Sequence, residues 1–201
     1  MIKTSESKLD GLSIKLYESI PHAVKDICAN YLSGFNSAIA INPEKIIQSK
    51  NSSELRNILL DADIRYADGI GVSKVLSQRL KKTVARIPGC ELWESLMKEA
   101  GYQGVPVYIL GAKQGVLDKT VNKLETEFGV QVVGSSSGYF SSQDDILNEI
   151  KRSKAKIVSV ALGSPRQEKF ILHAKSSGAE GFFMGVGGTY DVFVGEVERA
   201  P

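Results

Sequence analysis

The sequence predicts one α/β domain, built on a doubly wound, mainly parallel sheet with helices on both faces. Short apolar runs rich in Val, Ile, Phe and Tyr alternate with longer segments of helical periodicity over the whole chain. The apolar runs are continuous, which is typical of parallel strands covered on both faces. No linker, internal repeat or low-complexity tract interrupts the alternation, so residues 1–201 are predicted to form a single domain.

The composition is that of an ordinary globular protein, with 42% hydrophobic and 24% charged residues. Two cysteines, Cys28 and Cys90, are too few for a disulfide scaffold and suit a reducing compartment. A net charge of +2 is too small to indicate a partner that is a nucleic acid. The polar N-terminus is no secretory signal, and the longest apolar stretch, 105–112, is far shorter than the ~20 residues of a membrane span. We therefore expect a cytoplasmic protein that is at most peripheral to a membrane.

The element boundaries follow from the apolar runs and from residues that start helices. Helix starts are predicted where a capping residue precedes a proline or an acidic first turn, at Asn42-Pro43, at Ser52-Ser53 and at Ser164-Pro165. The predicted strands cover residues 12–17, 37–41, 64–66, 83–87, 105–110, 130–133, 157–162 and 181–186.

Polar residues and glycines follow the predicted strands. In an open parallel sheet, ligands bind beyond the carboxyl ends of the strands, where helix N-termini point inward. The sequence therefore predicts that something polar binds at this edge. The candidate binding residues there are Asn42, Gly69, Gly111, Gly138, Tyr139, Arg166, Gln167, Gly187, Gly188, Thr189 and Asp191.

The glycine-rich segment 185–188 resembles a dinucleotide fingerprint only in part. The third glycine of that pattern would fall at Tyr190, and no acidic residue ends a following strand. A Rossmann-like fold without a dinucleotide fingerprint is therefore predicted, and the absence of a Gly-Lys-Ser/Thr sequence excludes a P-loop. Two interpretations remain: backbone N–H groups that cradle a diphosphate, or a tight turn without a ligand.

Asp68 directly follows a predicted strand and precedes Gly69, which lets the chain turn away from the carboxylate. A partly desolvated carboxylate in a cleft can act as a general base. Alternatively, Asp68 caps a helix that begins near Ile70. The residue types alone leave both interpretations open.

Gln167 and Glu168 lie in the first turn of the helix predicted after Ser164-Pro165. The N–H groups of a first turn favour an anion, to which Arg166 could add a charged contact. The alternative is a capping arrangement made by Glu168.

No pattern predicts a metal site. Asp61-Ala62-Asp63 matches the Asp-x-Asp pattern of a divalent-cation motif. Because it precedes the predicted strand 64–66, it lies at the amino end of that strand and is interpreted as a solvated helix end away from the binding edge. His22 and His173 have no partner at ligand spacing, so surface or packing roles are expected. Cys90 is interpreted as a small buried residue.

Six segments occur in this order along the chain: INPEKI at 41–46, YADGIGV at 66–72, RIPGCELWESL at 86–96, GSSSGYF at 134–140, LGSPRQEKF at 162–170 and GVGGTYDVFVGEVERAP at 185–201. In order and spacing they resemble the WecG/TagA/CpsF glycosyltransferases, family 26. The resemblance implies a metal-independent, inverting transfer of an N-acetylmannosamine-type sugar from a UDP donor. The implied acceptor is undecaprenyl-diphosphate-linked N-acetylglucosamine at the cytoplasmic face of the membrane, and no cofactor is implied.

The resemblance also implies roles for individual residues. Asp68 would be the general base that deprotonates the acceptor hydroxyl, and Asn42 and Gln167 would face the sugar or the reaction centre. Some members carry a Thr where this chain has Ala40, so the role of that hydroxyl does not transfer. The wall of the UDP pocket would comprise Gly187, Gly188, Thr189 and Asp191.

Within the family, segments 164–167 and 188–193 are most similar to the branch that acts in enterobacterial common antigen synthesis with UDP-N-acetylmannosaminuronic acid. The branch that makes the teichoic-acid linkage unit from UDP-N-acetylmannosamine is the alternative. A uronic acid adds a carboxylate, for which Arg166 is the candidate partner.

Family members continue beyond the position of Pro201 with a basic tail that docks on the membrane, so we expect that this chain lacks that tail. A homo-oligomer is compatible with the resemblance, although no sequence pattern supports it. Two other classes are alternatives: a non-catalytic nucleotide-sugar-binding protein, which would not need Asp68, and a dinucleotide-dependent oxidoreductase, which would bind NAD(H).

Overall fold

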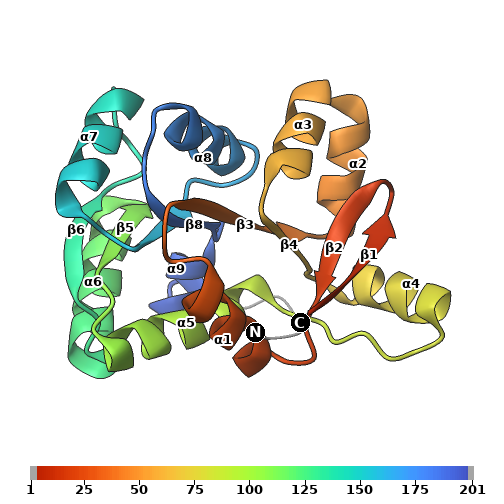
Figure 1. The fold of residues 1–201 in the computed structure, drawn as a ribbon. Helices are drawn as coiled ribbons and strands as arrows, with labels where there is room; N and C mark the ends of the chain where they lie inside the picture. The colour runs from red at the N-terminus through yellow and green to blue at the C-terminus, as the bar shows by residue number, and fades with distance from the viewer. Residues whose placement is uncertain (1–3, 199–201) are drawn as a thin grey trace.

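A computed structural model describes residues 4–198 and confirms the predicted fold class (Figure 1). The prediction of a missing tail concerns residues 199–201 and beyond, which lie outside the described residues. The strands form one sheet in the order β1-β2-β4-β3-β8-β7-β5-β6, in which only β1 and β2 are antiparallel. The strands are β1 (Ser5–Leu9), β2 (Leu12–Leu16), β3 (Phe35–Ile41), β4 (Ile64–Ala67), β5 (Val107–Gly111), β6 (Val132–Ser136), β7 (Ile157–Ala161) and β8 (Gly181–Gly185).

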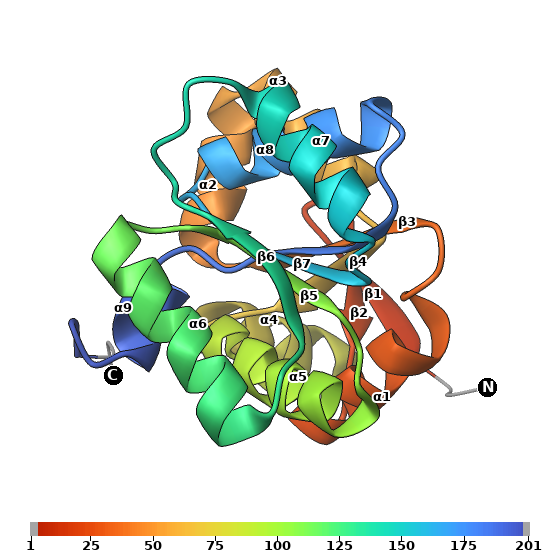
Figure 2. The ribbon, with the colours of Figure 1, turned by 90° about the vertical axis from the view of Figure 1, so that its left-hand side faces the viewer.

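Helices cover the sheet on both faces. In Figure 2, α2, α3, α7 and α8 lie above the sheet, and α1, α5, α6 and α9 lie below it. The helices are α1 (Ile20–Asn30), α2 (Pro43–Asn51), α3 (Ser53–Asp61), α4 (Ile70–Leu80), α5 (Gly89–Gln103), α6 (Gln114–Phe128), α7 (Gln143–Ser153), α8 (Arg166–Ser176) and α9 (Thr189–Phe193).

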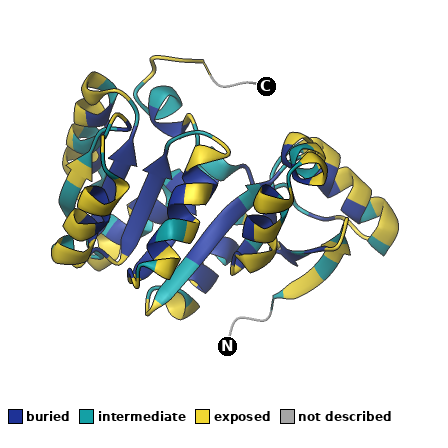
Figure 3. Cartoon of the chain, turned by 90° about the horizontal axis from the view of Figure 1, so that it is seen from above, coloured by how far each residue is buried: buried dark blue, intermediate teal, exposed yellow. Residues whose placement is uncertain are grey.

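The central strands are buried on both faces, which explains their continuous apolar sequences. Every residue of β5, β7 and β8 is buried, and Figure 3 shows these dark strands between helices whose outer faces are exposed. Below the sheet, Trp93 and Leu96 of α5 pack with Leu124 of α6 in one cluster of fully buried side chains. Above it, Phe170 of α8 packs with Phe183 of β8.

The topology places a crevice beside β3. The chain leaves β3 for β4 on one side, whereas β8 reaches the other side of β3 from β7. Because successive connections lead away from this point in opposite directions, the loops after β3 and β8 separate at the carboxyl edge. This is the position at which an open α/β sheet binds its ligand.

The prediction of a strand at 83–87 is wrong. This segment is extended, but it links α4 to α5 without joining the sheet. Val84 and Ile87 are buried, at 8% and 1% exposure, so burial in a connecting segment produced the alternating apolar pattern. One hydrogen bond, from the N–H of Ile87 to the carbonyl of Ala67, ties the segment to the end of β4.

Strand β1 was not predicted, because its sequence, Ser5–Leu9, is mostly polar. It lies at the sheet edge and pairs only with β2, so its burial is low. The sequence did contain a hairpin signal in Asp10-Gly11, whose φ angles of 50° and 77° suit the tight turn that joins the two strands.

Two of the three predicted helix starts have the predicted side-chain caps. The side chains of Asn42 and Ser52 accept hydrogen bonds from the N–H groups of Lys45 and Leu55, respectively. At α8 the residue at the cap position is Pro165, and no side chain caps the helix.

Candidate functional site

A cavity of about 570 Å³ lies at the carboxyl edge of the sheet, between the segments that follow β3, β4 and β8. Its wall is mainly made by residues at strand ends and helix starts, as the topology requires. The lining residues are Ala40, Asn42, Lys45, Tyr66, Asp68, Arg86, Pro88, Gly89, Cys90, Ser164, Gln167, Gly185, Val186, Gly187, Gly188, Thr189, Asp191, Val192, Val197 and Glu198.

Asp68 lies immediately beyond β4, with its backbone N–H bound to the carbonyl of Ile41 at the end of β3. Gly69, at a φ of +87°, occupies the cap position of α4, so Asp68 does not cap that helix. Burial raises the pKa of the Asp68 carboxyl, while the positive charge of Arg86 and the N–H groups of Gly89 and Gly69 act in the opposite direction. The net result is a partly desolvated carboxylate that is a stronger base than an exposed aspartate.

Lys45, which lines the cavity, forms a buried ion pair with Glu168. Their Nζ and Oε1 atoms are 2.7 Å apart, and the side chains are 7% and 1% exposed. The pair connects the first turn of α2 to the first turn of α8, so it fixes these helix starts relative to each other. Glu168 therefore does not make the cap that was the alternative to an anion contact.

Gln167 joins this pair to the glycine-rich turn. Its Nε2 donates to Glu168 Oε1 over 3.1 Å, and its Oε1 accepts the N–H of Gly187 over 2.9 Å. Gly185 provides the space for this side chain, because a Cβ there would lie 2.9 Å from Gln167 Nε2. The buried pair thus supports a side chain that holds the turn.

The turn itself is compact and leads directly into α9. Gly187 has a φ of +56°, which an L side chain rarely adopts, and a Cβ on Gly187 or Gly188 would meet no atom within 4 Å. The open space beside these two glycines lets a ligand approach the backbone closely. Thr189 donates its hydroxyl hydrogen bond to the carbonyl of Val186 over 2.6 Å, which fixes the end of the turn.

The structure brings together seven of the twelve predicted site residues. Asn42 lines the cavity while its Oδ1 caps α2, so its amide N–H₂ group is the part that can meet a ligand. The others that line the cavity are Asp68, Gln167, Gly187, Gly188, Thr189 and Asp191.

The remaining predicted site residues lie outside the cavity wall. Gly111 packs against the carbonyl of Ala161, where a Cβ would lie only 2.2 Å from the oxygen, and Arg166 places its guanidinium 4.8 Å from the ring centroid of Phe140. Those that do not line the cavity are Gly69, Gly111, Gly138, Tyr139 and Arg166.

Sequence reasoning did not single out Lys45, Tyr66 or Arg86, although all three line the cavity. Each lies inside a segment that carries the family resemblance, but none follows directly after a predicted strand: Tyr66 and Arg86 lie within predicted strands, and Lys45 lies four residues beyond one. Arg86 belongs to the wrongly predicted strand 83–87, which hid its position beside Asp68. Lys45 lies in the first turn of α2, and that position was the available signal.

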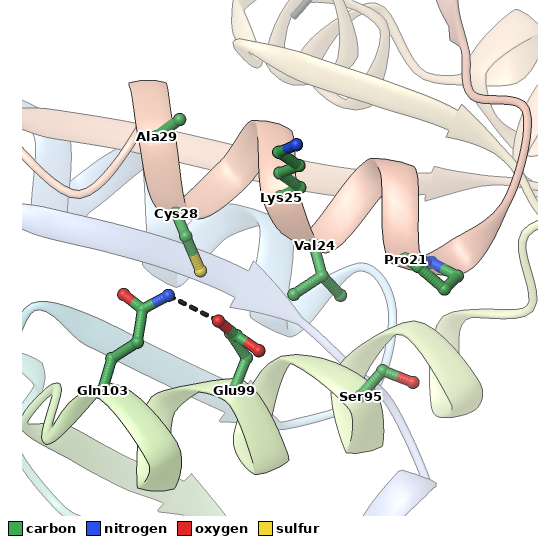
Figure 4. Close-up of a pocket in the computed structure, with 8 residues that line it drawn as sticks. All are labelled: Pro21, Val24, Lys25, Cys28, Ala29, Ser95, Glu99 and Gln103. Atoms are coloured by element: carbon green, nitrogen blue, oxygen red, sulfur yellow. Dashed lines mark hydrogen bonds between the residues drawn. The ribbon is translucent and has the colours of Figure 1, made fainter.

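A second cavity, of about 610 Å³, lies between α1 and α5 (Figure 4). Gln103 donates a 2.5 Å hydrogen bond to Glu99 inside it, and burial together with Glu99 raises the pKa of Cys28 to about 11. Its lining comes from the sides of the two helices, with no strand end and no glycine-rich turn. The carboxyl-edge cavity is therefore the better candidate for a functional site.

The Asp61-Ala62-Asp63 segment lies away from the cavity, as predicted from its place before β4. Asp61 forms an exposed ion pair with Lys175, and Asp63 accepts hydrogen bonds from the N–H and hydroxyl of Ser37. Within residues 4–198, no three His, Cys, Asp or Glu side chains are grouped so that they could hold a metal ion. Over the same residues, no helix has the length and apolar character that crossing a bilayer requires.

The cavity thus combines one desolvated carboxylate, the guanidinium of Arg86, the ammonium of Lys45 paired with Glu168, and a glycine-rich turn whose backbone is open to a ligand. A carboxylate can remove a proton from a hydroxyl, while cations and N–H groups can hold a phosphorylated leaving group. Comparison with known families agrees with this chemistry, because residues 8–201 match the model described as "Glycosyl transferase WecG/TagA/CpsF family". This match covers almost the whole chain, and the protein therefore belongs to the WecG/TagA/CpsF family of glycosyltransferases.

Proposed function

We propose that the protein is an inverting, metal-independent glycosyltransferase that moves N-acetylmannosaminuronic acid from its UDP donor to undecaprenyl-diphosphate-linked N-acetylglucosamine. This reaction makes a lipid intermediate of enterobacterial common antigen. The proposal extends family membership, which makes the chain a glycosyltransferase that acts on a nucleotide sugar in polysaccharide synthesis. The family also suggests a lipid-linked acceptor.

The observation that carries the proposal is the position of Asp68 in the same cavity as the glycine-rich turn. In the proposed reaction, Asp68 takes the proton of an acceptor hydroxyl as the oxygen attacks C1 of the donor sugar. The bond between C1 and the phosphate oxygen breaks on the opposite face, and UDP leaves with the bonding electron pair. One direct displacement inverts the configuration at C1, and the raised pKa of Asp68 makes its carboxylate a better proton acceptor.

In this proposal, the glycine-rich turn and the nearby cations bind the diphosphate of the donor. The backbone at Gly187 and Gly188 is open to a ligand, and the guanidinium of Arg86 supplies positive charge in the same cavity, where Lys45, paired with Glu168, also lies. Thr189 and Asp191 complete the proposed wall of the UDP pocket.

Arg166 is the proposed partner of the uronate carboxylate. It lies in the first turn of α8, next to Gln167, where the helix N-terminus also favours an anion. If Arg166 recognises this group, Arg166→Ala lowers kcat/KM for the uronic-acid donor by about tenfold, the worth of one charged contact, and spares the neutral donor. Equal effects on both donors in parallel transfer assays would contradict this role. Lys169→Ala, an exposed change on the same helix, is the control.

The experiment that tests the function offers UDP-N-acetylmannosaminuronic acid and UDP-N-acetylmannosamine in parallel, each radiolabelled, with a lipid-diphosphate-linked N-acetylglucosamine acceptor. Transfer from the uronic acid alone supports the proposal. Transfer from the neutral sugar alone assigns the protein to teichoic-acid linkage synthesis. Transfer from neither donor while UDP still binds contradicts the proposed catalysis and favours a nucleotide-sugar-binding protein. The proposed place of action is the inner face of the cell membrane, where the protein would bind peripherally.

A further inference from the structure

Tyr66 is a buried residue whose hydroxyl makes no hydrogen bond within residues 4–198. The side chain extends from β4, two residues before Asp68, and is 0% exposed. Nevertheless Tyr66 lines the carboxyl-edge cavity, and its hydroxyl has no hydrogen-bond partner among residues 4–198. A buried polar atom without a partner is unfavourable, so a site that keeps one calls for an explanation.

Three other buried tyrosines of this protein are satisfied. The hydroxyl of Tyr17 donates to Asp26 over 2.9 Å, and that of Tyr190 donates to the Ser159 hydroxyl over 2.7 Å. The hydroxyl of Tyr108 bonds to Ser136 and to Glu149. Tyr66 departs from this pattern at the position where its hydroxyl borders a cavity.

Gly89 locates the Tyr66 hydroxyl relative to the base. A Cβ on Gly89 would lie 3.1 Å from the Tyr66 hydroxyl oxygen and 3.5 Å from Asp68 Oδ2. Both oxygens therefore lie on the same side of Gly89, at the start of α5, and all three residues line the cavity. A substrate group bound in the cavity beside Gly89 can contact both oxygens.

The chemistry of the hydroxyl makes it a hydrogen-bond donor. Burial and the negative charge of Asp68 raise the pKa of Tyr66 well above its ordinary value, so the phenol keeps its proton. A neutral phenol beside a carboxylate offers a complementary pair, in which one group donates a proton to a hydrogen bond and the other accepts one.

We infer that the Tyr66 hydroxyl binds an oxygen of the acceptor sugar, beside the hydroxyl group that Asp68 deprotonates. The inference rests on the proposed function, because the acceptor is the substrate that must touch the base. Tyr66 would thus recognise the acceptor. Its uncharged hydroxyl donates a hydrogen bond that orients the acceptor sugar for attack on the UDP-sugar. The acceptor would then give the Tyr66 hydroxyl the hydrogen bond that residues 4–198 do not provide.

Tyr66→Phe tests the inference, because it removes the hydroxyl and keeps the ring. We expect the KM for the acceptor to rise, and kcat/KM for the acceptor to fall, by about tenfold, the worth of one hydrogen bond between uncharged groups. The affinity for UDP should stay the same. The melting temperature should stay the same or rise, since the substitution removes a buried atom that had no partner.

Tyr108→Phe is the control, because Tyr108 is also a buried tyrosine, but its hydroxyl has partners and it does not line the cavity. This change should lower the melting temperature and leave the acceptor KM unchanged. Gly89→Ala provides a second test from the other side of the same space. Its methyl group would crowd the Tyr66 hydroxyl and should also raise the acceptor KM without changing UDP affinity.

The inference is overturned if Tyr66→Phe leaves acceptor kinetics unchanged. It is also overturned if UDP affinity falls in step with activity, or if the melting temperature drops as in Tyr108→Phe. Unchanged acceptor kinetics would mean that the Tyr66 hydroxyl contacts no substrate. A loss of UDP affinity would mean that it contacts the UDP-sugar, and a lower melting temperature would mean that it has a hydrogen-bond partner in the folded protein. Failure of the proposed function is distinct, because the unsubstituted protein would then transfer no sugar to the acceptor.

Discussion

Asp68 shows how one residue is made reactive by its surroundings. The strand that ends at Ala67 delivers the carboxylate to the cavity, and Gly69 turns the chain away so that the side chain is not used as a helix cap. Burial raises the pKa of this carboxyl, although Arg86, two N–H groups and Lys45 favour its charged form. The protein therefore keeps a carboxylate where ionisation is unfavourable, which is expected of a functional residue more than of a structural one.

This environment predicts that Asp68→Asn stabilises the protein in a pH-dependent manner. Because the pKa of Asp68 is higher in the folded state, folding stability falls as the pH rises through that raised value. The amide carries no charge, so the variant should unfold at a higher urea concentration than the unsubstituted protein at pH 7. The difference should shrink towards pH 4, and Asp61→Asn, at an exposed site, should show no such gain.

At the same scale, the sequence identified the catalytic candidate but not its environment. Asp68 and Gln167 could be predicted because each lies next to a strand end or a helix start. The contacts of Lys45 with Glu168 join residues far apart in the sequence, so no local pattern reveals them. Arg86 was missed because a buried connecting segment has the apolar alternation of a strand.

Among the elements, α2 and α8 are held together by the buried ion pair of Lys45 and Glu168. Glu168 also accepts a hydrogen bond from the side chain of Gln167, which in turn accepts the N–H of Gly187. Two helix starts and the glycine-rich turn are therefore positioned by one hydrogen-bonded group. The geometry of the cavity depends on this group as much as on the residues that face the ligand.

Removing one charge of the Lys45–Glu168 pair should lower the free energy of unfolding more than removing both charges. Lys45→Met leaves the Glu168 carboxylate buried without its cation, and we expect a loss of about 3–5 kcal/mol in the free energy of unfolding. Lys45→Met with Glu168→Met removes both charges and should recover most of that loss. Urea denaturation measures the free energy of unfolding of the single and the double variant. Equal losses in these two proteins would contradict a buried ion pair. Lys169→Met breaks an exposed pair with Glu54 between α8 and α3 and should have a far smaller effect.

Gly111 illustrates a glycine required by packing at a strand end. Its φ is +125°, and a Cβ would lie 2.2 Å from the carbonyl oxygen of Ala161 in the neighbouring strand β7. Gly111→Ala should therefore destabilise the protein by roughly 1–3 kcal/mol. Gly115→Ala, in the first turn of α6 with no atom near its added Cβ, should instead stabilise it by about 0.5–1 kcal/mol. The explanation would be contradicted if thermal denaturation showed that both variants are stabilised or that both are destabilised.

For the whole molecule, the order of the strands determines where function can lie. The loops after β3 and β8 separate at the carboxyl edge, and the base, the cations and the turn all lie there. The sequence predicted this edge because continuous apolar runs require a covered parallel sheet. It did not predict the hairpin strand β1, because a polar edge strand gains its stability from pairing with β2 and not from burial.

The measurement that tests the account most directly compares the unsubstituted protein with Asp68→Asn in two assays. One is sugar transfer to the lipid-diphosphate-linked acceptor, and the other is UDP binding by calorimetry. If Asp68 is the base and the glycine-rich turn holds the donor, the variant loses transfer by at least about a hundredfold and binds UDP as before. Transfer that survives in Asp68→Asn would contradict the assignment of Asp68 as the base that deprotonates the acceptor.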